Sequence, residues 1–160
     1  MIVQNTMTSP VITLFPDTPF PEALKVMKEH RIRRIPIVNK QNKLVGIISE
    51  RDLLQASPSS ATSLNIWEMN YLLAKLAVRD VMTRSVVTVT PHTLLQDAAS
   101  LMLKHKVGGL PVISTEQEVV GVITETDIFR EFVNLLNADQ SARLDTNGYR
   151  EKSLLTIESQ

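Results

Sequence analysis

The chain contains two copies of one sequence pattern, and this internal repeat limits its possible folds more than any other feature. Shifted by 75 residues against itself, the sequence aligns without a gap, so that Gly46 falls on Gly121 and Asp52 on Asp127. A period this long, present only twice, does not indicate a solenoid, and a unit of about 50 residues buries only a marginal core alone. We therefore expect one pseudo-symmetric body in which a site on one repeat has a counterpart on the other.

Composition excludes several classes of protein. The 160 residues fit about one domain, and 17 basic and 17 acidic side chains give zero net charge, so we expect neither a nucleic-acid nor a membrane-surface partner. No apolar run approaches the roughly 18 residues that span a bilayer, and the first residues do not resemble a signal peptide. The absence of cysteine excludes disulfides, thiolate metal sites and a cysteine nucleophile. These features predict a cytoplasmic globular protein.

Each repeat predicts a β-α-β-β-α unit of the mixed α/β (α+β) class. A short extended segment precedes a helix that we expect Thr18 or Thr93 to cap, and a second helix begins at Ser49 or Thr124. Between the helices, the sequence predicts two strands joined by a polar turn. The extended segments and strands are 11–14, 35–38 and 44–48 in the first repeat, and 86–89, 110–113 and 119–123 in the second. The second strand of each repeat is a continuous apolar run, typical of burial on both faces or across an interface.

These elements divide the chain into four parts. We expect a first repeat at 3–56, a linker with an inserted helix at 57–77, a second repeat at 78–136 and a polar, mobile tail at 137–160. The inserted helix carries the only tryptophan, Trp67, and we expect it to pack over the first repeat or against a partner. One face of this helix is marked by Ile66, Met69, Asn70, Leu73 and Leu76.

The most specific local motif begins with Gly46 and ends at Asp52. A glycine in a buried strand allows another backbone or a ligand to approach closely. Ser49 then stands where the strand becomes a helix, and its hydroxyl and the free N–H groups of the first turn can bind phosphate. The carboxylate of Asp52 can accept hydrogen bonds from two vicinal hydroxyls, as on a ribose. The second repeat has the same motif at Gly121, Thr124 and Asp127. Phosphate and ribose together indicate a nucleotide.

A capping box explains the same residues without a ligand. Ser or Thr followed three residues later by an acid can satisfy the orphan N–H groups of a helix. Two details favour the ligand: the box prefers Glu or Gln because Asp is short for the reach back, and Glu50 and Glu125 already supply negative charge to the first turn. Both interpretations remain open at this point.

The residues from 3 to 136 resemble a pair of CBS (cystathionine β-synthase) motifs, which together form a Bateman module. The resemblance rests on a hydrophobic-Pro pair, a turn, and a Gly-containing strand that ends in Ser/Thr-x-x-Asp, all present twice at one spacing. The inserted helix with Trp67 and the segment 106–111 are similar to stand-alone bacterial CBS-pair proteins, including the acetoin-utilisation type. The resemblance implies two pseudo-symmetric β-α-β-β-α motifs packed as one module.

The resemblance also implies a ligand with an adenosine group: AMP, ADP or ATP, or else S-adenosylmethionine, NAD or a cyclic dinucleotide such as cyclic di-AMP. It assigns ribose to Asp52 and Asp127, and phosphate to Ser49 and Thr124. Main chain around Val11, Thr13, Ile35 and Pro36 would contact one adenine, and main chain around Val86, Thr88, Leu110 and Pro111 the other.

Basic residues often precede the hydrophobic-Pro pair in this family, and Arg33 and Arg34 match that pattern, with Arg51 nearby. A solvated charged face is the simpler interpretation of these arginines. The second repeat departs here, because Gly108 and Gly109 replace the arginine pair and Thr126 replaces Arg51. The two sites therefore need not both fill, nor prefer the same ligand.

Together these features predict a regulatory, energy- or metabolite-sensing module rather than an enzyme, with no catalytic residue, metal site or required cofactor. We expect a homodimer of modules that signals to a separate effector protein. The alternative is a dimeric interaction scaffold without a ligand, in which the Ser/Thr–Asp pairs are only helix caps. An enzyme acting on nucleotides is disfavoured, since no acid, base or metal cluster stands beside the phosphate position.

Overall fold

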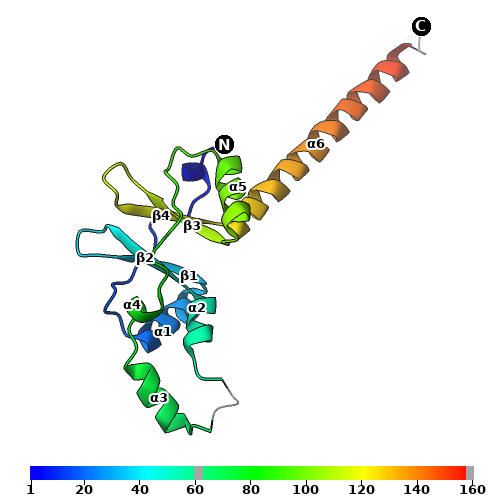
Figure 1. Cartoon of the computed structure of the whole chain (residues 1–160). Coiled ribbons are helices and arrows are strands. Elements are labelled where there is room, and N and C mark those ends of the chain that lie inside the picture. The colour runs from blue at the N-terminus through cyan, green and yellow to red at the C-terminus, as the bar shows by residue number, and fades with distance from the viewer. Residues whose placement is uncertain (60–62, 158–160) are drawn as a thin grey trace.

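The computed structural model describes the backbone of residues 1–59 and 63–157, and the side chains within these ranges as far as Ala142. Two β-hairpins lie side by side at the centre, and helices cover them on the outside (Figure 1). The last helix extends away from the rest of the chain (Figure 1). This arrangement is of the predicted α+β class.

The two repeats contain the same helix-strand-strand-helix order. The first has α1 (Phe20–His30), β1 (Arg34–Val38), β2 (Leu44–Ser49) and α2 (Glu50–Ala56). The second has α5 (Leu95–His105), β3 (Gly109–Ile113), β4 (Val119–Thr124) and α6 (Glu125–Ile157). Each strand pair is antiparallel, with Ile35 opposite Ile48 and Leu110 opposite Ile123. These elements confirm the helices and strands predicted from the apolar periodicity.

The segments before the first helices are not strands, and that part of the prediction is wrong. Only Leu14 pairs with β1: its N–H donates to the Pro36 carbonyl at 3.2 Å, and its own carbonyl accepts from Val38 N–H at 2.9 Å. Val89 makes the equivalent bridge to Val112 in the second repeat. A single bridging residue does not make a strand, so segments 11–14 and 86–89 are extended connections.

The predicted threonine caps are also wrong. Pro19 and Leu94 occupy the N-cap positions, and neither makes a side-chain cap bond. The Thr18 hydroxyl instead accepts a hydrogen bond from Phe15 N–H at 3.2 Å, and the second repeat repeats this at Thr93. These hydroxyls therefore close the turn that precedes each helix rather than the helix itself.

The leading segment of each repeat pairs with the last strand of the other repeat. Thr83 exchanges two hydrogen bonds of 2.9 Å with Ile47 on β2, and Thr8 exchanges bonds of 2.9 and 3.1 Å with Val122 on β4. The segments contain two short helical turns, η1 (Val3–Asn5) and α4 (Val78–Val81). We call these leading segments, which run from η1 to Thr8 and from α4 to Thr83, the exchanged arms. They connect the repeats in addition to the contact between the facing surfaces of the repeats.

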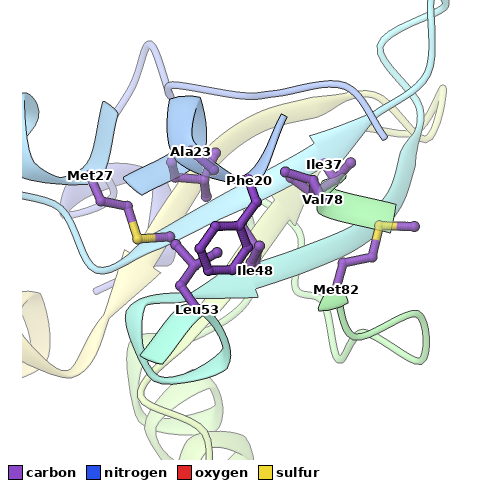
Figure 2. Packing of buried hydrophobic residues seen from close by; sticks show 9 residues of the cluster. Phe20, Ala23, Met27, Ile37, Ile48, Leu53, Val78 and Met82 are labelled. Carbon is purple, nitrogen blue, oxygen red and sulfur yellow. The ribbon is translucent and has the colours of Figure 1, made fainter. Parts of the chain in front are cut away.

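The exchanged arms complete the two hydrophobic cores. Val78 and Met82 pack in the first core with Phe20, Ile48 and other residues of the first repeat (Figure 2). Val3 packs in the second core in the same way, and both Val3 and Val78 have 0% of their surface exposed. Neither core consists of one repeat alone, which agrees with the marginal core expected for so small a unit.

Gly46 makes room for an arm of the chain and not for a ligand. A Cβ atom on Gly46 would lie 2.6 Å from Met82 Sδ and 3.0 Å from the Thr83 carbonyl oxygen. On Gly121 it would lie 2.7 Å from Met7 Sδ. The close approach predicted at the glycine is therefore confirmed, and its partner is the exchanged backbone.

The turns of the two hairpins also touch. Asn42 Nδ2 donates to the Val119 carbonyl at 3.2 Å, Val119 N–H donates to the Asn42 carbonyl at 3.1 Å, and the Lys43 ammonium donates to the Glu116 carbonyl. A hydrogen bond from the Thr115 hydroxyl is the main cause that lowers the pKa of the Glu116 carboxyl in this turn. These contacts join the repeats at the end of the hairpins.

The inserted helix is confirmed as α3 (Ile66–Ala74), which Asn65 caps and which contacts α1. Trp67 on this helix is 80% exposed. At the other end of the chain, α6 continues as helix to Ile157, where the sequence pattern predicted no regular structure. The mobility of that segment stays a prediction. None of the helices in the described part of the chain is long and apolar enough to cross a membrane.

Candidate functional site

A cleft of about 470 Å³ lies between the repeats. The first repeat contributes residues around β2 and the start of α2, together with the arginine pair at the start of β1. The second repeat contributes its leading arm and the loop between α5 and β3. Both repeats are therefore needed to form the cleft.

Ser49 and Asp52 form a closed capping box at the wall of this cleft. Asp52 Oδ2 accepts from Ser49 N–H at 2.7 Å and from the Ser49 hydroxyl at 2.8 Å, while Ser49 Oγ accepts from Asp52 N–H at 3.1 Å. The expectation that aspartate is too short for this reach is wrong. Asp52 Oδ1 has no protein partner among the described residues, and the side chain is half-buried. One oxygen thus caps the helix while the other remains available.

Asp127 occupies the equivalent position in the second repeat, but both of its oxygens have partners. Oδ2 accepts from Thr124 N–H at 2.9 Å and from the Thr124 hydroxyl at 2.7 Å, and Oδ1 accepts from Arg130 Nη1 at 3.1 Å. Asp127 is 5% exposed. The first repeat has Gln55 where the second has Arg130. The two aspartates are therefore equivalent in sequence but differ in availability.

Arg34 reaches across from the first repeat to the second. Its Nη2 lies 4.0 Å from Glu125 Oε1 at the start of α6. A Cβ atom on Gly108 would lie 2.8 Å from Arg34 Cζ, and one on Gly109 would lie 3.0 Å from Arg34 Cδ. Gly108 and Gly109 stand where the first repeat has its arginine pair, and their lack of side chains provides the space that Arg34 occupies.

Lys106 is a cleft residue that the predicted site does not contain. It follows α5 directly and has left-handed backbone angles, φ 54° and ψ 43°. Arg31 has nearly the same angles after α1 but does not line this cleft. The signal that would identify Lys106 is its alignment with Arg31 in the repeat, which puts a cation directly before each β-hairpin.

Six of the predicted site residues meet in this cleft: Arg33, Arg34, Ser49, Arg51, Asp52 and Val86. Thr88 lines a separate hollow of about 310 Å³ beside Lys43. Val11 and Thr13 are half-buried and line neither space. Thr124 and Asp127 lie at their own helix start, outside the cleft. The remaining four, Ile35, Pro36, Leu110 and Pro111, are buried.

The buried prolines already use their carbonyl groups. The Pro36 carbonyl accepts from Leu14 N–H at 3.2 Å, and the Pro111 carbonyl accepts from Val89 N–H at 3.1 Å. Adenine contacts at these positions stay a prediction.

The model of the CBS domain family matches residues 3–59 and 78–134. Among known proteins, an uncharacterised protein of Methanocaldococcus jannaschii, MJ1426, is 30% identical over 83% of this chain and 92% of its own length. An inosine-5'-monophosphate dehydrogenase of Korarchaeum cryptofilum is 34% identical over 84% of this chain. The match spans only 25% of that longer enzyme.

Solved structures with the same fold include several CBS pairs. An acetoin utilization protein homologue (AcuB) from Vibrio cholerae is 34% identical, with a TM-score of 0.72 over 88% of this chain and 96% of its own. The CBS domain pair of protein MJ0100, in complex with 5'-methylthioadenosine and S-adenosyl-L-methionine, is 30% identical, with a TM-score of 0.71 over 84% and 97%. CBSX2 in complex with AMP is 29% identical, with a TM-score of 0.68 over 84% and 97%.

The family model covers both repeats, and the solved CBS pairs share the fold over more than four fifths of the chain. The chain therefore belongs to the CBS domain family and contains a pair of CBS repeats that form one Bateman module.

Proposed function

We propose that this chain is a regulatory module that binds an adenosine-containing ligand in the cleft beside Asp52. The observation that carries the proposal is the unpartnered Asp52 Oδ1 at a cleft whose walls carry cations from both repeats. The volume of about 470 Å³ falls within the range of small-molecule sites. Related CBS pairs of known structure hold AMP, 5'-methylthioadenosine or S-adenosylmethionine. AMP, ADP and ATP are the first candidates, followed by S-adenosylmethionine, NAD and cyclic di-AMP.

The residues of the cleft suggest a division of roles. Asp52 accepts hydrogen bonds from the ribose hydroxyls through Oδ1, while Ser49 orients its carboxylate through the two bonds to Oδ2. Arg33, Arg34 and Arg51 attract the phosphate end. The second predicted site, at Thr124 and Asp127, is complete only if Arg130 leaves Asp127 Oδ1.

Ligand binding in this cleft is expected to act on the packing of the two repeats. Both repeats line the cleft, so a ligand there stabilises the relative arrangement in which the cleft walls best fit it. The free energy available for signalling is the difference in affinity between that arrangement and any other. In this proposal the module has no catalytic role, and the signal passes to a separate effector protein.

The test is a thermal-shift and calorimetric panel of AMP, ADP, ATP, S-adenosylmethionine, NAD and cyclic di-AMP, with and without magnesium. A compound that binds only the folded state raises the melting temperature. We expect Asp52→Ala to weaken binding of the active compound about tenfold or more, because charged hydrogen bonds are lost. Gln55→Ala, an exposed change on the same helix, is the matched control. If no adenosyl compound shifts the melting temperature, the sensor proposal is wrong.

A scaffold function without ligand is the second candidate. The helix starts favour it, because Ser49 and Asp52 satisfy each other's backbone N–H groups at the start of α2, and Asp127 accepts from Thr124 N–H at the start of α6. Large apolar side chains are also exposed on the second repeat, among them Leu103 at 81% and Phe129 at 66%. We propose that a second copy of the module covers part of this surface as a homodimer. Under the scaffold function, sedimentation would detect the dimer while the whole nucleotide panel gives no shift. The cytoplasmic location stays a prediction.

A further inference from the structure

We infer that the cleft beside Asp52 selects its nucleotide by the number of phosphates, taking ADP or ATP in preference to AMP and S-adenosylmethionine. This inference rests on the proposed function, since it concerns the same site. It depends on the charge of the cleft, on the way Arg34 is held, and on the backbone at Lys106.

The cleft is positively charged although the whole chain has zero net charge. Its cationic residues are Arg33, Arg34, Arg51 and Lys106, and its acidic residues are Glu50 and Asp52. Four cations against two carboxylates leave an excess of two positive charges in the cleft, and each of the four cations can donate to a separate phosphate oxygen. Additional phosphates therefore gain further charge-assisted contacts, whereas the sulfonium of S-adenosylmethionine meets like charge.

Arg34 is available for a ligand because its present partner holds it loosely. Its distance of 4.0 Å to Glu125 Oε1 lies at the limit of an ion pair, and the Glu125 side chain is 55% exposed. The Arg34 side chain is only 25% exposed, but at 4.0 Å the pair contains no hydrogen bond that would hold the guanidinium in place. A phosphate accepts two parallel hydrogen bonds from a guanidinium and is the stronger partner. Because Gly108 has no Cβ atom, the Arg34 guanidinium lies against its backbone at the wall of the cleft.

Lys106 adds a cation from the second repeat, at a position whose backbone conformation favours glycine. Its φ of 54° is in the left-handed region, which disfavours residues with a Cβ atom. Replacement by glycine is therefore expected to preserve or raise stability while it removes the charge. Arg31, with a φ of 53° at the equivalent position, does not line the cleft. Replacing Lys106 or Arg31 by glycine changes the backbone in the same way, but only the replacement of Lys106 removes a charge from the cleft. Comparing the two variants therefore separates the effect of charge on nucleotide binding from the effect of the backbone.

The experiment is isothermal titration calorimetry of the whole chain with AMP, ADP, ATP and S-adenosylmethionine, in buffer without divalent cations. We expect the wild type to bind ATP or ADP about tenfold or more tightly than AMP, as for one or two added charge-assisted contacts. Lys106→Gly and Arg34→Gln should each reduce this ratio about threefold or more. Arg31→Gly should leave the ratio unchanged. Thermal melting of each variant without nucleotide establishes that it is folded.

The outcomes distinguish the two proposals. Equal affinity for AMP and ATP, or an unchanged ratio in Lys106→Gly, would overturn selection by phosphate number and leave the adenosyl site intact. Tighter binding of S-adenosylmethionine than of any nucleotide would also overturn it. Failure of all four compounds to bind would overturn the adenosyl site and this inference with it.

Discussion

At the scale of single residues, equivalent positions in the two repeats have different surroundings. Asp52 and Asp127 each accept hydrogen bonds from the backbone N–H and the hydroxyl of the Ser or Thr three residues earlier, but only Asp127 is also bonded to an arginine, Arg130. Gln55 replaces that arginine in the first repeat. One substitution outside the motif thus decides whether the second carboxylate oxygen is free, and the repeat alignment alone gives equal weight to both sites.

This difference predicts unequal costs for removing the two carboxylates. In the ligand-free protein, Asp52→Ala should lower the free energy of unfolding by about 1 kcal/mol, the usual value of a lost cap. Asp127→Ala should cost about 2 kcal/mol, because a buried carboxylate loses a charged hydrogen bond as well. Urea unfolding followed by circular dichroism measures both. Equal costs would mean that the Arg130 contact contributes nothing to stability.

The site could be predicted only in part for a related reason. The Ser/Thr–Asp motif and the arginine pair have a fixed spacing in the sequence, so Ser49, Asp52, Arg33 and Arg34 could be identified. Lys106 joins them only through the packing of the second repeat on the first. Its alignment with Arg31 marks it as a cation before a hairpin, but Arg31 does not line the cleft, so the alignment alone does not place Lys106 there.

At the scale of elements, the helices and the paired strands follow from apolar periodicity, whereas the exchange of the arms does not. Val3 and Val78 occupy equivalent positions, and the two cores are built from equivalent residues. The sequence pattern alone therefore does not tell which arm packs in which core. The length and direction of the connections decide between the two, and these appear only in three dimensions.

The exchange predicts that residues near the N-terminus matter as much as residues in the middle of the chain. Val3→Ala and Val78→Ala should each lower the free energy of unfolding by about 2 kcal/mol, since each removes buried methyl groups from a packed core. Urea unfolding of the two variants tests this. Gln4→Ala, at an exposed neighbouring position, is the control for the arm itself. A cost near zero for Val3→Ala would show that the first arm is not packed in solution, as is common for chain ends.

At the scale of the whole molecule, each repeat depends on an arm of the other. Unfolding of the first repeat withdraws the arm that carries Val3 from the second core, and unfolding of the second repeat has the reciprocal effect on the arm that carries Val78. The touching hairpin turns add a further connection, through Asn42 and Val119. Two small cores joined in this way should behave as one cooperative unit.

We therefore predict a single unfolding transition for residues of both repeats. Hydrogen exchange of Ile48 on β2 and Ile123 on β4 should give equal opening free energies, and Val3→Ala should lower both by the same amount although it lies in only one core. Exchange monitored by NMR measures each amide separately. A decrease confined to Ile123 would show that the repeats open independently.

The exchanged arms also determine when this protein can fold during its synthesis. Thr8 is made before its partner Val122, which follows more than a hundred residues later in the chain. Until then the second core cannot form, and the first arm has no surface to pack against. Contacts between segments so distant in the chain slow folding, so the arm of the nascent first repeat stays unpaired until β4 has been translated.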